Sequence, residues 1–414
     1  MKLRSLCLAV LLALGVSVVP GCAAPAEGPA GSSVDEIVDV PQTDVERQSI
    51  GNCWLYAHAS WVESMHKAAT GESFDTSQSY WTYWHWFDQI AGGFATKIST
   101  GGNWTTANNI VKKYGIAPEA AFVDADTLTE MSSRQSAALA AIDESLKNGV
   151  LRDSAARRDK KIVRQELDLA WGLTPAVIAM LDGVFGENVS RTFSSTTSPA
   201  SAADSPLRRA VDFEVSYPSA PGQAAQPKKL AQAMTDWRQV YFSAVDTRPF
   251  LLRVQKALHE AQPVIITWFV DFNALENRAN DRRGAFNMST LTELGPGRQG
   301  GHMTVLEDYQ VKLSDGTVLA AGQTLDPASS SDQALLARAL EPGSEVQFLR
   351  VKNSWGAARP DRAFAPGLPG YHDLYLDYLS GPVKKCVERD GNTDNSNCPT
   401  TTTPLQNVVL PPGF

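Results

Sequence analysis

Three residues in this chain have the types and the order needed for thiol-dependent acyl transfer. Cys53 lies in the run from Gln48 to Trp54 (QSIGNCW), His302 follows Gly301, and Asn353 lies in the run KNSWG. A thiol becomes a strong nucleophile when a base takes its proton and a third group holds that base in the right tautomer. The pattern therefore predicts Cys53 as the nucleophile, His302 as the base and Asn353 as the group that orients the base.

The nucleophile requires an element that favours its thiolate, and the sequence supplies a helix that begins at the cysteine. Trp54, Ala57, Trp61 and Met65 recur at helical spacing through residue 70, and Gly71 is a suitable helix end. A thiol at a helix N-terminus faces the positive end of the helix dipole, which stabilises the thiolate. We expect the base to come from a strand over residues 302–311.

The remaining elements are predicted as helices first and strands later. Helices are expected over 76–87, 104–114 and 249–260, and further strands over 264–270, 346–351 and 371–379. A block at ~125–245 holds helical stretches at 130–148, 155–171 and 174–185, followed by a loop at 190–226. This order predicts an α+β fold with a helical N-terminal half, a sheet-containing C-terminal half and a large helical insertion.

Four motifs, taken together, resemble those of the papain family (C1) of cysteine peptidases. They are the run around Cys53, the pair Gly101-Gly102 followed by YGI at 114–116, the Gly301-His302 step, and KNSWG followed by a Gly-Tyr pair at 370–371. The resemblance implies a papain-like peptidase domain over residues 44–414 that cleaves peptide bonds. It also implies that Gln48 and the Cys53 backbone N–H form an oxyanion hole, which stabilises charge in the transition state.

The resemblance further implies a set of residues beside the substrate, namely Gly101, Gly102, Gly301 and Trp355. Glycine lets an extended peptide come close to the backbone. Trp355 is also expected to shield the bond between the histidine and the asparagine from water.

The chain departs from the family pattern at three places. Gly301 precedes His302 where the family more usually has Asn or Asp. Arg47 stands where the family's glutamine is expected, and Gln48 lies one residue nearer to the cysteine. The spacing from Cys53 to His302 exceeds the ~130–150 residues of papain-like enzymes by roughly 100, which is the size of the block at ~125–245. An insertion of this kind resembles the bleomycin-hydrolase-like branch. We expect the block either to roof the cleft or to extend the core and pack away from it.

The first 22 residues predict export. Lys2 and Arg4 precede an apolar stretch at 6–19, as in a secretory signal peptide, and Cys22 ends a run, VPGC, that resembles a bacterial lipoprotein box. This predicts lipidation of Cys22 and an anchor in the bacterial cell envelope, with a flexible tether over residues 23–43. The alternative is ordinary cleavage nearby and a soluble secreted protein.

Two further cysteines lie in a polar stretch within the predicted C-terminal tail at 381–414. Cys386 and Cys398 are twelve positions apart. Because an exported protein meets an oxidising environment, we expect them to form a disulfide.

The composition limits the range of functions. The chain has 414 residues, 43% hydrophobic and 20% charged, with a formal net charge of -8 and no basic stripe. Nucleic acid is therefore not expected as a partner, and no metal or organic cofactor is implied. The expected partners are peptide or protein substrates and a lipid anchor. Two alternatives stay open: a Cys-His-Asn amidase acting on non-peptide or isopeptide amides, and a non-catalytic surface binding protein on a peptidase scaffold.

Overall fold

The computed structural model describes residues 40–195, 205–326, 328–389 and 392–414. The predicted signal peptide, Cys22 and most of the tether lie outside these residues, so export and lipidation stay predictions. Within the described part of the chain, no helix combines the length and the apolar character needed to cross a membrane.

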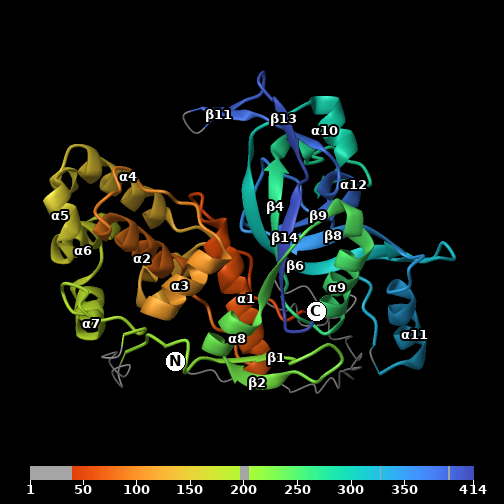
Figure 1. The fold of residues 1–414 in the computed structure, drawn as a ribbon, viewed down its shortest axis with the longest axis horizontal. Coiled ribbons are helices and arrows are strands. Elements are labelled where there is room, and N and C mark those ends of the chain that lie inside the picture. The colour runs from red at the N-terminus through yellow and green to blue at the C-terminus, as the bar shows by residue number, and fades with distance from the viewer. Residues whose placement is uncertain (1–39, 196–204, 327, 390–391) are drawn as a thin grey trace, which may run out of the picture. The chain divides into compact units, whose positions relative to one another are not determined.

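The fold is mixed α+β, as the sequence predicts. In Figure 1 the helices α2 to α7 lie together, the strands of a large sheet lie together, and α1 stands between them and contacts β6. The helices are α1 (Cys53–Thr70), α2 (Gln78–Ala91), α3 (Trp104–Tyr114), α4 (Ser133–Lys147), α5 (Ser154–Arg158), α6 (Lys160–Trp171), α7 (Pro175–Phe185), α8 (Leu230–Asp236), α9 (Thr247–His259), α10 (Met288–Leu294), α11 (Ser330–Ala339) and α12 (Leu376–Leu379).

Local capping explains why α1 and α3 have the bounds predicted from the sequence. Gly71 ends α1 with a φ of 76°, a left-handed conformation that glycine adopts without a steric penalty, and its N–H donates to the Lys67 carbonyl. The Asn103 side chain caps the start of α3 by accepting from the Thr106 N–H. Both helices therefore carry their own start or stop signals.

The large sheet has eight strands, of which seven follow the order β3-β14-β4-β6-β8-β9-β5, and β7 pairs with β6. The strands on either side of β6 are antiparallel to it, and these central strands are almost wholly buried. The strands are β1 (Glu214–Tyr217), β2 (Gln226–Lys229), β3 (Arg238–Tyr241), β4 (Ile265–Asp271), β5 (Ala285–Phe286), β6 (Gln299–Lys312), β7 (Val318–Leu319), β8 (Glu345–Lys352), β9 (Tyr371–Tyr375), β10 (Val383–Lys385), β11 (Val387–Arg389), β12 (Asn392–Asp394), β13 (Thr400–Thr402) and β14 (Leu405–Leu410).

The segments at the two ends of the predicted peptidase domain pack against the rest of the protein. The predicted tail at 381–414 contains β14, which inserts between β3 and β4 and is therefore part of the sheet's core. At the other end, Val40 is fully buried and Gln42 nearly so, although both belong to the predicted tether. The strand predicted at 371–379 also stops early, because its last four residues form α12.

The described part of the block at ~125–245 packs against the elements on either side of it in the sequence. Its helix α6 packs against α2 through the buried Trp171, whose ring contacts Tyr83, Trp86 and Phe122. The stretch predicted as loop at 190–226 contains the buried strand β1, and β3 near the block's end pairs with β14 in the large sheet. The described part of the block therefore extends the core of the protein.

This packing predicts the result of emptying the Trp171 site. Trp171→Ala removes a side chain that is 1% exposed and should lower the free energy of unfolding by about 3–5 kcal/mol, because the cavity cannot fully collapse. Leu169→Ala, at a position 78% exposed on the same helix, should change it by less than about 0.5 kcal/mol. Urea denaturation followed by circular dichroism measures both; equal losses would show that the block does not share the helical core.

Candidate active site

The pairing of β6 with β8 brings His302 and Asn353 together. Val305 lies opposite Lys352 in this antiparallel pair, so Asn353 continues β8 to a place opposite Thr304. Side chains two apart on a strand share a face, so Asn353 shares the face of His302 on a diagonal. The His302 Nε2 and Asn353 Oδ1 atoms lie 2.7 Å apart, and both residues are buried.

The hydrogen bonds around Asn353 determine which imidazole nitrogen carries the proton. The backbone N–H of Ser354 donates to Asn353 Oδ1 at 2.8 Å, which identifies this atom as the oxygen. An oxygen acceptor requires the His302 Nε2 to donate, so in the neutral ring Nδ1 is the unprotonated nitrogen. Asn353 Nδ2 in turn donates to His372 Nδ1 at 3.3 Å. His302 is therefore held in the tautomer whose Nδ1 can accept a proton.

Cys53 lies at the first position of α1, where the helix has no side-chain cap. The Asn52 side chain instead donates to Thr82 and Gln135. The first N–H groups of a helix have no partner within the helix, and those of Cys53 and Trp54 are directed at the sulfur together with the N–H of Met303. Because Met303 follows His302 on β6, this contact places the thiol beside the histidine's strand.

Cys53, His302 and Trp355 line one cleft of about 510 Å³. The Trp355 ring stacks on the imidazole with 4.7 Å between ring centroids and 18° between planes. Trp268 on β4 contacts the same imidazole edge-on. The two indoles surround the imidazole with apolar surface, which protects its bond to Asn353 from water.

Burial favours the neutral forms of both reacting groups. It raises the pKa of the Cys53 thiol to about 11, although the three N–H groups oppose this. It lowers the pKa of His302 to about 4, with the bond to Asn353 opposing and the nearby charge of Arg362 adding to the effect. The N–H groups at the helix N-terminus act in the expected direction, toward the thiolate, but desolvation of the buried thiol outweighs them here.

A short backbone pairing joins the segment before Cys53 to the segment after Asn353. Gln48 N–H donates to the Ser354 carbonyl and Gly356 N–H to the Glu46 carbonyl, each at 3.0 Å, with Arg47 bridged to Trp355 between them. These pairings hold the nucleophile's loop against the segment that carries the asparagine.

Gln48, the residue expected in an oxyanion hole, lies in the cleft, and its side-chain amide forms two hydrogen bonds within the protein. Its Oε1 accepts from Ser354 Oγ and its Nε2 donates to the Ile50 carbonyl, each at 2.7 Å. An amide nitrogen carries two hydrogens, so one N–H remains to meet an oxygen in the cleft.

The predicted substrate glycines fall into two groups. A Cβ on Gly102 would lie 2.4 Å from the Trp54 ring, so this glycine lets its loop pack onto the residue after Cys53, and neither Gly101 nor Gly102 is among the lining residues of the cleft. Gly301 does line the cleft, and a Cβ there would meet nothing within 4 Å. The requirement for glycine is therefore steric at position 102, whereas position 301 has open space.

The C-terminal arm, defined here as residues 383–389 and 392–402, forms part of the cleft wall. Cys386 and Cys398 are joined by a disulfide. Gln299, three residues before His302, donates to the Lys384 carbonyl at 2.7 Å and accepts from the Cys386 N–H at 2.9 Å. Glu388 and Thr393 of the arm line the cleft. Sequence reasoning missed this role because the arm meets β6 only through long-range contacts.

Only Met131 of the described residues at 125–245 lines the cleft. The expectation that this block roofs the cleft is thus not supported by the described residues, and the alternative, a block that extends the core, fits its packing.

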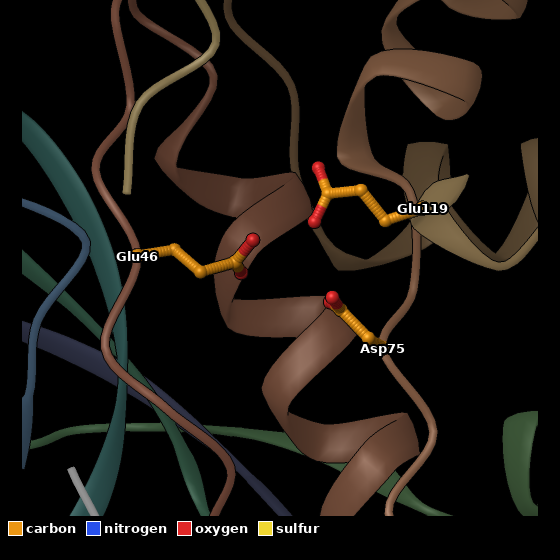
Figure 2. A group of neighbouring side chains, drawn as sticks. All are labelled: Glu46, Asp75 and Glu119. Atoms are coloured by element: carbon orange, nitrogen blue, oxygen red, sulfur yellow. The ribbon is translucent and has the colours of Figure 1, made fainter. Parts of the chain in front are cut away.

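Three carboxylates that do not line the cleft form a cluster, which invites comparison with a metal site. Figure 2 shows Glu46 pointing toward Asp75 and Glu119, whose ligand atoms all lie within 4.8 Å of one another. Burial, followed by the charge of Asp75, raises the pKa of Glu119 to about 9, and burial also raises the pKa values of Glu46 and Asp75. Glu119 shares a hydrogen bond with Asp75, and Gln78 donates to Glu46 at 2.5 Å. Protonation and these hydrogen bonds thus reduce the repulsion among the three carboxylates.

Comparison with models of known families finds no match, and neither does comparison with curated proteins. Among solved structures, the crystal structure of pepw from Lactobacillus rhamnosis HN001 is similar at 14% identity and a TM-score of 0.38, over 92% of this chain and 82% of that chain. The Amb a 11 cysteine protease, a major ragweed pollen allergen, is similar in its proform at 13% identity and a TM-score of 0.31, over 93% and 67%. Likenesses this low leave the activity to be inferred from the site itself.

The carboxylate cluster predicts a pH-dependent stability. Because the folded-state pKa of Glu119 lies near 9 and its ordinary value is 4.5, stability contributed by the protonated form is lost as the pH rises between these values. Glu119→Gln keeps a donor but cannot ionise, so it should raise the free energy of unfolding at pH 8 by more than about 1 kcal/mol and by much less at pH 4. Glu72→Gln, at an exposed position, is the control. Urea denaturation at both pH values checks this, and parallel profiles for the two variants would contradict it.

Proposed function

We propose that this chain is a cysteine-type peptidase with a papain-like fold, which hydrolyses peptide bonds through an acyl-enzyme on Cys53. One observation carries the proposal: the bond from His302 Nε2 to Asn353 Oδ1 leaves Nδ1 as the basic nitrogen of a ring that lines the same cleft as the thiol. The presence of the thiol in the same cleft favours a catalytic role for His302 over a purely structural one.

The first half-reaction forms a thioester. The Cys53 sulfur attacks the carbonyl carbon of the scissile peptide bond while its proton moves to His302 Nδ1. The carbonyl π electrons move onto oxygen, where the Cys53 backbone N–H and the remaining N–H of Gln48 stabilise the negative charge. The carbon–nitrogen bond then breaks, and His302 returns the proton to the leaving amine.

The second half-reaction returns the enzyme to its starting state. Water attacks the thioester carbon as His302 Nδ1 takes one of its protons. The sulfur leaves with the bonding electrons and regains the proton from His302, and the new carboxylic acid departs. Asn353 keeps Nδ1 directed at the reaction in both halves, because Nε2 stays bound to Oδ1.

The buried, neutral resting pair requires the proton to move during attack. A thiol with a pKa near 11 and an imidazole with a pKa near 4 are both neutral at pH 7. Charge therefore develops only as the sulfur attacks, when the N–H dipoles around Cys53 and the oxyanion hole act together.

Removal of the nucleophile should abolish turnover. Cys53→Ala is expected to reduce kcat/KM for peptides by at least about 10³-fold, because no other group can form the acyl-enzyme. Cleavage products from a mixed peptide library, measured by mass spectrometry, would establish the activity and its specificity. The thermal midpoint of the variant should stay close to that of the wild type. Peptide cleavage by Cys53→Ala at the wild-type rate would refute the mechanism, and cleavage of non-peptide amides alone would favour the amidase alternative.

The role of His302 can be measured at the thiol itself. Without the imidazole only the thiolate already present can react, and burial holds the thiol pKa near 11. His302→Ala should therefore slow alkylation of Cys53 by iodoacetamide at least about tenfold at pH 7, with the rate recovering as the pH rises toward that value. The control, His66→Ala, changes a histidine near the other end of α1. If His302→Ala is alkylated at the wild-type rate at pH 7, His302 does not act on this thiol.

A further inference from the structure

The cleft carries a positive charge that the chain as a whole does not. Of the described residues that line it, four are arginines, namely Arg47, Arg298, Arg359 and Arg362, whereas Glu388 is the acidic one. The chain has a formal net charge of -8. The arginines therefore make the electrostatic potential in the cleft positive, although the protein as a whole is negatively charged.

Two of the four arginines share one carboxylate partner, and the other two have none among the described residues. Asp361 pairs closely with Arg359, at 2.5 Å, and more distantly with Arg362, at 3.7 Å. Within the described parts of the chain, neither Arg47 nor Arg298 forms an ion pair with a carboxylate. Burial and then the charges of the other three arginines lower the pKa of Arg362 to about 10, whereas Asp361 opposes the change.

Aromatic rings fix two of the arginines close to the reacting groups. The Arg362 guanidinium lies 4.3 Å from the Trp355 ring, which itself stacks on His302. Arg298 lies 4.1 Å from the Phe272 ring, and Arg362 lies 4.8 Å from the same ring. Guanidinium groups stacked on rings keep their N–H edges available for carboxylates. The stacking also fixes the positions of these two charged side chains at the cleft.

We propose that this cleft selects peptides that carry carboxylates next to the scissile bond, with Arg298 and Arg362 as specificity-determining residues. The inference rests on the proposed peptidase function and adds its substrate class. The carboxylate can come from an aspartate or glutamate side chain or from the free C-terminus of a short peptide. Planar guanidinium groups bind either source through paired N–H bonds.

The test compares matched peptides and matched variants of the full chain. Peptides with Glu, Gln or Lys at each position flanking the cleaved bond, made as free acids and as C-terminal amides, distinguish the two sources of the carboxylate. We expect kcat/KM for the preferred acidic peptide to exceed that of its neutral counterpart by about tenfold at low salt, and the preference to shrink as salt screens it. Equal or higher kcat/KM for the neutral peptides at every position would overturn the proposal.

Variants locate the effect in the cleft. Arg298→Glu should reduce the preference for acidic peptides at least about fivefold. Arg298→Gln should reduce it less, and this variant replaces Arg298→Glu in the test if the charge reversal prevents folding. Arg152→Glu, at an exposed position outside the cleft, makes the same change in net charge and should leave the preference intact. An equal effect of Arg152→Glu and Arg298→Glu would assign the preference to net charge and overturn the assignment to the cleft.

A second readout does not depend on peptide cleavage. Iodoacetate is an anion and iodoacetamide is neutral, so the ratio of their rates at Cys53 reports the charge of the cleft. Arg298→Glu should lower this ratio at least about threefold, and Arg152→Glu should not. A wild type that cleaves no peptide would overturn the proposed function, whereas a wild type that cleaves peptides with an unchanged alkylation ratio in Arg298→Glu would overturn the inference alone.

Discussion

The site depends on the register between β6 and β8. Because Val305 faces Lys352, His302 and Asn353 share a face and their side chains lie within hydrogen-bond distance. A slip of one residue would move every side chain of β8 to the opposite face of the sheet. The apolar residues of β8 oppose such a slip, since it would put the charged residues Arg350 and Lys352 on the face where Leu349 and Val351 are fully buried. The orientation of one imidazole is therefore maintained by the hydrophobic core of the whole sheet.

Burial of the site has two opposing effects. It excludes water from the imidazole and strengthens every dipole that faces the sulfur, but it also makes charge on either group costly, as the pKa values of Cys53 and His302 indicate. Arg362 increases this cost for His302, and in the proposed mechanism its positive charge would also favour an oxyanion in the same cleft. The site that we propose would therefore have neutral groups at rest and would stabilise the charge that appears during the reaction.

The parts of the fold that could be predicted are those encoded within a few residues. Gly71, Asn103 and Gly115 cap α1 and α3, so the bounds of these helices follow from the sequence. The proposed catalytic set could be predicted because its three members lie in short, distinctive runs. The place of β14 in the sheet could not be predicted, since six residues near the C-terminus contain no signal for pairing with β3 and β4. The cationic cleft was missed for the same reason, because its arginines come from three separate segments and meet only in the folded chain.

The backbone pairing of 46–48 with 354–356 connects these observations. It places Arg47 and Gln48 in the cleft, on one short segment whose backbone is bound to the segment that follows Asn353. The same pairing continues through Trp355, which stacks on His302 and carries Arg362 on its ring. A displacement of this segment would therefore alter the oxyanion donor, the cover of the imidazole and the local charge together. The chemistry and the selectivity that we propose thus both depend on this backbone pairing. A substitution that weakens the pairing should therefore affect both.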